Sequence, residues 1–242
     1  MFQKRLLFHG ATLLVATILT LGCSNNFVQS VNPYVYGSSA SAEYFPLLEG
    51  YHTTYQITNS NGSSEIISYT VGREVPFLAD SATEWISDDN VSKKTNYFVM
   101  DGNTLKYYEN DKSTPEVVLE FPLTLGKTWS RFDNPASHIN DTGTTVVNPL
   151  LKDSSNVGVS FVSFLSEGVS LMTVDKIESI ELSNGVFYSD AIRVSNDAGG
   201  SSHNYFWYAP GVGLVKYVLG AVDSQNPVGA VGSELISYGF KP

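Results

Sequence analysis

Residues 51–71, Y-H-T-T-Y-Q-I-T-N-S-N-G-S-S-E-I-I-S-Y-T-V, have the pattern of a β-hairpin. From Tyr51 to Ile57 every second residue is Tyr, Thr, Tyr or Ile, which is the period of a half-buried strand. Asn61-Gly62 supplies the positive φ angles that a tight hairpin turn requires. Ile67, Tyr69 and Val71 then share one face of the returning strand, so the stretch predicts an antiparallel pair.

Two further hairpins are indicated by turn residues between strand-like runs. Asp101-Gly102-Asn103 separates one pair of runs, and Asn184-Gly185 separates another. Residues 169–182 change phase near Asp175, which predicts a β-bulge or bend there. Antiparallel pairing of neighbouring strands therefore extends well beyond the first hairpin.

Most of the remaining chain is also strand-like, with Gly-rich connections. Further strands are predicted at residues 117–121, 157–161, 205–208, 214–218 and 235–240. Residues 81–85 predict one short helix, and residues 131–153 a long loop. The prediction is an all-β fold, a single antiparallel domain over residues 44–242 with at most one or two short helices. A half-barrel, an open barrel and a sandwich all remain compatible with the pattern.

The N-terminus has the layout of a bacterial export signal. Lys4 and Arg5 precede an apolar run, residues 6–21, and Gly22-Cys23-Ser24 follows it directly. We expect residues 1–22 to be a lipoprotein signal peptide, Cys23 to carry the lipid and residues 23–43 to form a flexible tether. Thr20 stands where this cleavage site prefers Leu. An uncleaved anchor and an ordinary secretory peptide remain alternatives, because the apolar run is near the length of a membrane span.

Charge and cysteine content restrict the partners. The chain carries 14 basic and 24 acidic residues, a net charge of −10, and removal of the signal with Lys4 and Arg5 makes it −12. This excess of acid argues against nucleic acid as a partner, because phosphates require Lys and Arg. We expect the lipid on Cys23 to be the membrane contact. Ser24 replaces the Asp typical of inner-membrane retention, so the predicted location is the cell envelope, at the outer membrane where one exists.

A short motif occurs twice. Phe45-Pro46-Leu47-Leu48-Glu49-Gly50 and Phe121-Pro122-Leu123-Thr124-Leu125-Gly126 share F-P-L-x-x-G, 76 positions apart. Proline cannot donate to a strand ladder and glycine tolerates unusual dihedral angles, so each copy is expected at a bend where a strand begins or ends. The repeat is compatible with a duplicated half.

These motifs, together with Asn184-Gly185-Val186-Phe187 and Trp207-Tyr208-Ala209-Pro210-Gly211-Val212-Gly213-Leu214-Val215-Lys216, resemble a group of uncharacterised bacterial lipoproteins. The group is distantly TapB-like, and the resemblance covers most of residues 44–240. It implies an antiparallel half-barrel similar to lipoprotein-carrier domains, whose concave face holds acyl chains, and it implies no catalytic residues. Where members often have Trp three residues after the first motif's glycine, this chain has Thr53.

No motif for catalysis, metal or cofactor binding stands out. His52, His138 and His203 lie far apart in the sequence, without metal-ligand spacing. His203 lies beside Ser201-Ser202, but there is no G-x-S-x-G elbow, so a hydrolase is only a minor alternative. Acidic clusters such as Asp88-Asp89-Asn90 lack EF-hand spacing and are expected to be solvated loop residues. We expect no catalytic residue, no metal and no cofactor.

Aromatic residues are the remaining candidates for a site. A trough could be lined by tyrosines 51, 55, 69, 97, 107, 108, 205, 208 and 217, although ordinary strand packing explains them as well. The candidate ligand-binding residues are Tyr55, Tyr97, Tyr107, Trp207 and Tyr208. The leading hypothesis is a non-enzymatic envelope lipoprotein that binds an apolar ligand or a protein partner on a curved sheet. A structural or assembly protein without a small ligand is the alternative.

Overall fold

The computed structural model describes residues 43–78, 80–110, 115–131, 171–197, 202–225, 227–229 and 231–240. All of them lie in one compact unit, Tyr34–Pro242. The predicted signal peptide with Cys23, the tether up to residue 42, the strand at 157–161 and the loop beyond Arg131 lie outside the described residues.

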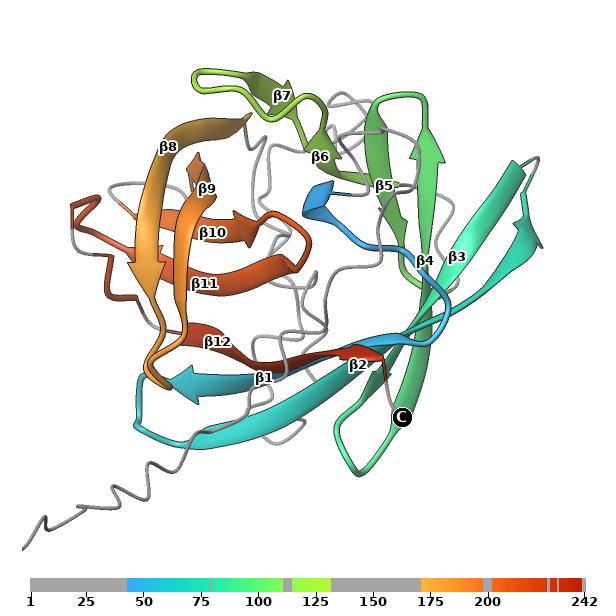
Figure 1. Ribbon diagram of the computed structural model, residues 1–242, viewed down its shortest axis with the longest axis horizontal. Coiled ribbons are helices and arrows are strands. Elements are labelled where there is room, and N and C mark those ends of the chain that lie inside the picture. Colours follow the sequence, from blue (N-terminus) through green and yellow to red (C-terminus); the bar gives the residue numbers. More distant parts are fainter. Residues whose placement is uncertain are drawn as a thin grey trace, which may run out of the picture. The chain divides into compact units, whose positions relative to one another are not determined.

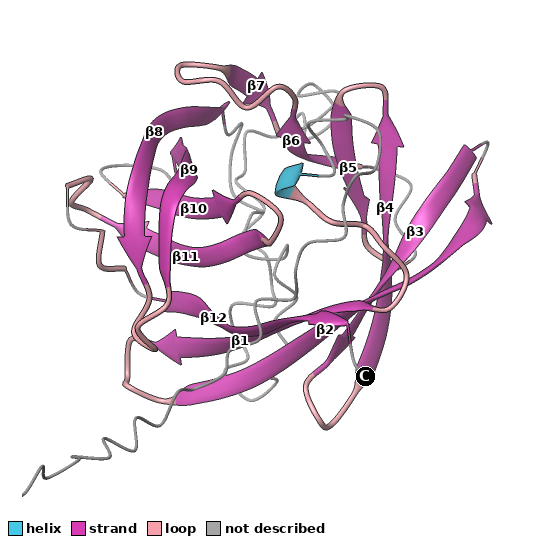
Figure 2. Ribbon diagram, viewed as in Figure 1, coloured by secondary structure: helices cyan, strands magenta, loops and turns pink. Residues whose placement is uncertain are grey.

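The described residues form twelve antiparallel strands in one nearly closed, barrel-shaped sheet (Figures 1 and 2). The strands are β1 (Tyr51–Asn59), β2 (Ser64–Phe77), β3 (Asp80–Asp88), β4 (Lys93–Asp101), β5 (Thr104–Tyr108), β6 (Glu116–Glu120), β7 (Thr128–Ser130), β8 (Leu171–Glu181), β9 (Phe187–Asp197), β10 (His203–Ala209), β11 (Gly213–Ala221) and β12 (Val231–Phe240). Their order in the sheet is β6-β5-β4-β3-β2-β1-β12-β11-β10-β9-β8-β7. The predicted all-β antiparallel fold is therefore confirmed, as a nearly closed barrel.

The period-2 pattern of β1 corresponds to its burial. Tyr51, Thr53, Tyr55 and Ile57 are buried, while the residues between them are half-buried or exposed. The partner strand β2 buries Ile67, Tyr69 and Val71 on the same face. Gly62 at the turn has φ +80°, a conformation that suits glycine. The apolar face of this hairpin forms part of the wall of the core inside the barrel.

Two sequence predictions about secondary structure are wrong, one about the type of an element and one about where a strand begins. Residues 81–85, expected as a short helix, belong to strand β3. Trp85 of this strand pairs with Val71 on one side and Asn96 on the other, so ladder bonds on both sides outweigh local propensity. Strand β12 begins at Val231 rather than at Leu235. The phase change near Asp175 is confirmed as a register shift between Val174 and Lys176.

The sheet consists of two six-strand meanders, β1–β6 and β7–β12, and each is preceded by one F-P-L-x-x-G segment. Gly50 and Gly126 both have φ +83°. Gly50 N donates to Val71 O on the second strand of its meander, and Gly126 N donates to Val174 O on the second strand of the other, both at 2.8 Å. The two segments therefore adopt the same local structure, as an internal duplication would produce.

The two meanders meet at two seams of different character. At one seam β1 and β12 pair over the whole of β1. At the other seam, between β6 and the end of β7, Val117 N donates to Arg131 O at 2.6 Å. The Arg131 guanidinium, 1% exposed, also lies 2.7 Å from the Glu116 carboxylate. An ion pair between buried Arg131 and half-buried Glu116 thus links the two edges of the sheet, beside the single backbone hydrogen bond.

Candidate functional site

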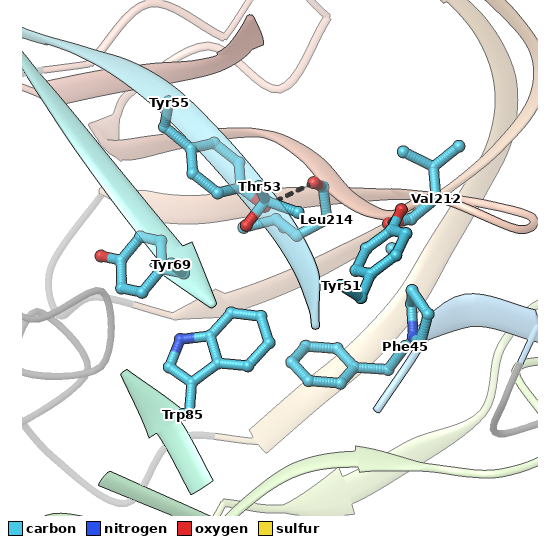
Figure 3. Close-up of a pocket in the computed structure, with 10 residues that line it drawn as sticks. Phe45, Tyr51, Thr53, Tyr55, Tyr69, Trp85, Val212 and Leu214 are labelled. Atoms are coloured by element: carbon cyan, nitrogen blue, oxygen red, sulfur yellow. Dashed lines mark hydrogen bonds between the residues drawn. The ribbon is translucent and has the colours of Figure 1, made fainter. Parts of the chain in front are cut away.

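A small apolar cavity opens inside the barrel, beside the first F-P-L-x-x-G segment (Figure 3). It is lined by Phe45, Pro46, Tyr51, Thr53, Tyr55, Tyr69, Trp85, Val212, Gly213 and Leu214. These residues come from the segment before β1, from strands β1, β2 and β3, and from the β10–β11 turn with the start of β11. Figure 3 shows the aromatic rings arranged around a common space. Segments distant in the sequence therefore build one site.

Phe45 and Pro46 form one wall because the segment that carries them is fixed to the β10–β11 turn. Gly211 N donates to Glu43 O at 2.6 Å. Gly213 has φ +97°, and a Cβ atom there would lie 3.2 Å from Pro46 Cδ, so glycine permits this close approach. Phe45 packs its ring 5.4 Å from that of Trp85 and is buried. The turn of the W-Y-A-P-G-V-G segment thus positions Phe45 and Pro46.

Two of the cavity's three tyrosines, Tyr51 and Tyr55, have their hydroxyl groups bonded to the backbone of the second meander. Tyr55 OH donates to Leu214 O at 2.8 Å, and Tyr51 OH donates to Val212 O at 3.1 Å. Burial raises the pKa of the Tyr55 phenol far above its ordinary value, so this group stays neutral. Because the polar ends of Tyr51 and Tyr55 are bonded to backbone carbonyls, their rings present apolar surface to the cavity.

The cavity is narrow. It encloses about 360 Å³ of space between atoms, including its opening to solvent. Most of this space is too narrow for solvent, and it has room for roughly one water. In this conformation the cavity fits a slim apolar group, such as the end of an alkyl chain, rather than a whole lipid.

Three of the predicted site residues lie on the inner face of the barrel. Tyr55 lines the cavity. Tyr107 lies at the far end of a continuous row of aromatic rings, with centroids 5.3 to 5.8 Å apart, that crosses strands β1 to β5: Tyr55, Tyr69, Trp85, Phe98 and Tyr107. Tyr208 is 1% exposed, and burial, with a smaller contribution from nearby Tyr55, raises the pKa of its phenol far above the ordinary value. Their role in ligand binding remains a prediction.

Tyr97 and Trp207 lie on the opposite face of the sheet. Tyr97 neighbours Phe98 in strand β4 and packs against Phe77, with ring centroids 4.6 Å apart, in a cluster separate from the main core. Trp207 pairs across the ladder with Lys216 and donates its Nε1 hydrogen to Glu178 Oε1 at 2.9 Å. The structure therefore does not bring these two residues together with Tyr55 in one trough.

The sequence prediction missed several of the cavity's residues. Phe45, Thr53, Trp85 and Leu214 line it but were not among the candidates. The signal that could have found them is the pairing of two motifs, since the F-P-L segment and the W-Y-A-P-G-V-G turn contact each other. Trp85 was missed because residues 81–85 were predicted as a helix, so its side chain was not assigned to the inner face of a strand.

Comparison with known proteins yields remote likenesses. No protein-family model and no curated protein matches the chain. A protein inferred to be exported, with a YmcC-like fold, from Bacteroides fragilis NCTC 9343 is 12% identical over 81% of this chain and 99% of its own, with a TM-score of 0.33. A protein inferred to be a lipoprotein from Parabacteroides distasonis ATCC 8503 is 15% identical over 81% and 98%, with a TM-score of 0.36. LprF from Mycobacterium bovis is 13% identical over 78% and 85%, with a TM-score of 0.24.

All three TM-scores are below 0.5, so these likenesses carry no argument about the site. By their descriptions, one of the three is an exported protein, one is a lipoprotein and the third is LprF. What this chain binds has to be inferred from its own residues.

The candidates for other chemistry are dispersed. In the part of the chain that the structure describes, no three His, Cys, Asp or Glu side chains gather as metal ligands would. Asp88 and Asp89 accept hydrogen bonds from backbone amides of their own turn, which hold the pKa of each carboxyl below its ordinary value. His203 lies at the start of β10, with its ring 6.2 Å from that of Tyr205.

Among the described residues no helix is long and apolar enough to cross a membrane.

Glu234 should make the stability of the fold depend on pH. It is bonded to Lys216, which pairs with Trp207. Burial alone would raise the pKa of the Glu234 carboxyl. Hydrogen bonds from Lys216 Nζ at 2.8 Å and Ser183 N at 2.7 Å outweigh burial and lower it below its ordinary value of 4.5. A lowered carboxyl pKa stabilises the fold above the unfolded-state pKa, and the contribution is lost as pH falls through the folded-state value.

We therefore expect the free energy of unfolding to fall as the pH drops below about 4.5. Urea unfolding at pH 7 and pH 3 measures the change. The Glu234→Gln variant keeps the shape but cannot titrate, so its unfolding free energy should depend less on pH than that of the wild type. Equal pH dependence in the two proteins would show that Glu234 contributes nothing to acid sensitivity.

Proposed function

We propose that this chain is a non-enzymatic, lipid-anchored protein of the cell envelope that holds one slim apolar group in the cavity beside Thr53. The ligand enters between the aromatic rings of the first meander and the β10–β11 turn. The class we infer is an alkyl chain or a comparably narrow apolar molecule.

The cavity's lining is the observation that supports this proposal. Of the described residues that line it, none carries a charge, and the two buried tyrosine hydroxyls of β1 are bonded to backbone carbonyls. A site of this kind cannot neutralise a charged headgroup, but it can remove apolar surface from water at about 25 cal/mol per Å². The charged end of a lipid would therefore remain outside the cavity.

The anchor is proposed from the sequence. Gly22-Cys23-Ser24 after the apolar run favours acylation of Cys23. Acylation would place the barrel at a membrane surface, where apolar ligands are concentrated. We propose the outer membrane as the location, because Ser24 is not the residue that typically retains lipoproteins at the inner membrane.

Tryptophan quenching tests the ligand. The chain contains three tryptophans, Trp85, Trp129 and Trp207, and of these only Trp85 lines the cavity. Dodecanoate brominated at its terminal carbon quenches indole fluorescence at short range. Added to the full chain, it should quench part of the emission, because the bromine enters the cavity beside Trp85.

Two matched variants show where the brominated probe binds. Trp85→Phe, which keeps an aromatic ring in the cavity wall, should lose the quenching, whereas Trp207→Phe, on the opposite face, should keep it. If Trp85→Phe is quenched as strongly as the wild type, the ligand lies elsewhere. If the wild type is not quenched at any probe concentration, the chain does not bind this class of ligand and a structural role is favoured.

A further inference from the structure

Thr53 and Trp129 occupy equivalent positions in the two meanders. Each follows the glycine of its F-P-L-x-x-G segment by three residues. Thr53 pairs with Tyr69, two residues before Val71, which accepts the Gly50 N–H. Trp129 pairs with Met172, two residues before Val174, which accepts the Gly126 N–H. The register of the two halves is therefore the same at this point.

The two positions differ in how they fill the interior. Both side chains are 3% exposed, and Trp129 belongs to the main hydrophobic core. Thr53 is a much smaller residue at the equivalent point, and the cavity lies directly beside it. The simplest physical account is that the indole of Trp129 fills in the second half the space that Thr53 leaves open in the first.

A second difference concerns the residue after each glycine. Tyr51 lines the cavity, and its hydroxyl is bonded to Val212 O. The equivalent residue of the second half is Lys127, whose ammonium lies 3.2 Å from Glu120 Oε1 and donates to Phe121 O at 2.9 Å. A charged, paired side chain in place of an apolar ring makes that part of the second half unsuitable for an apolar ligand.

We propose that Thr53 is the specificity-determining residue of the cavity and that the chain holds one apolar ligand, in its first meander. The small side chain at position 53 leaves the narrow space of the cavity open, so its size limits how wide the bound group can be. This inference rests on the proposed function and adds its location, its stoichiometry and the residue that limits the ligand's width.

Native mass spectrometry of the full chain with dodecanoate as the probe tests the inference. The wild type should bind one dodecanoate. Thr53→Trp, which copies the second half, should weaken binding by at least about tenfold, because the added indole occupies the cavity. Thr53→Val is the matched control: it removes the hydroxyl, keeps the size, and should bind within about twofold of the wild type. Thr53→Leu, a smaller addition, should bind with intermediate affinity and provides a second readout if Thr53→Trp does not fold.

The outcomes separate this inference from the proposed function. If the wild type binds one dodecanoate and Thr53→Trp or Thr53→Leu binds it equally well, position 53 does not limit the site, although ligand binding stands. Two ligands on the wild type would contradict a single site in the first meander. No binding by any of the proteins would overturn the proposed function and this inference with it.

Discussion

Glu116→Ala is expected to lower the free energy of unfolding by about 3 kcal/mol, because it removes a carboxylate that is in contact with the buried Arg131 guanidinium. The Arg131 side chain is 1% exposed, and its Nη2 lies 2.7 Å from Glu116 Oε2. We choose the lower end of the range for a broken buried pair because the Glu116 side chain is 22% exposed, so water compensates part of the loss. Equilibrium unfolding in urea, monitored by tryptophan fluorescence, gives the value.

A double variant separates lost charge compensation from lost packing. Glu116→Leu combined with Arg131→Met removes both charges and keeps side chains of similar length. It should recover most of the stability, since buried ion pairs are often replaced by apolar residues at little cost. The hydrogen bond from Val117 N to Arg131 O is a backbone contact and can persist in the double variant. If the single and double variants are equally unstable, packing rather than charge holds this seam.

Cys23→Ser is expected to abolish incorporation of radiolabelled palmitate and to leave the signal peptide uncleaved. A serine hydroxyl cannot form the thioether to the lipid, and we expect processing to depend on that step. The wild type should take up label and remain in the membrane fraction through high salt, because each buried methylene contributes about 0.8 kcal/mol and a lipoprotein cysteine carries more than one chain. Wild-type protein recovered soluble and unlabelled would mean that Cys23 only marks the end of an ordinary signal.

The local sequence pattern was sufficient to predict the strands that have one exposed face. Tyr51, Thr53, Tyr55 and Ile57 alternate with more exposed residues, and Asn61-Gly62 marks the turn, so both the strand and its inner face could be predicted. Tyr205 to Tyr208 are all buried, since β10 is covered on both faces. Period-2 reasoning places Trp207 and Tyr208 on opposite faces, but with no contrast in polarity it could not show which of the two points into the barrel.

The cavity itself could not be predicted, because it depends on register between distant strands. Phe45 reaches Trp85 only when residues 43–48 are fixed to the β10–β11 turn, more than 160 residues further along the chain. The F-P-L-x-x-G repeat was visible in the sequence, and so was Thr53 in a place where Trp is frequent in the resembling group. What was missing was the pairing that makes Thr53 and Trp129 equivalent, which only the sheet reveals.

The position of a bound ligand tests the central claim most directly. Crystals of the protein grown with dodecanoate brominated at its terminal carbon would give the bromine position from anomalous scattering. The account predicts one bromine per chain, enclosed by Thr53, Tyr69 and Trp85, with the carboxylate outside the cavity. A bromine on the opposite face, beside Tyr97 or Trp207, or an unoccupied cavity at saturating ligand, would contradict it.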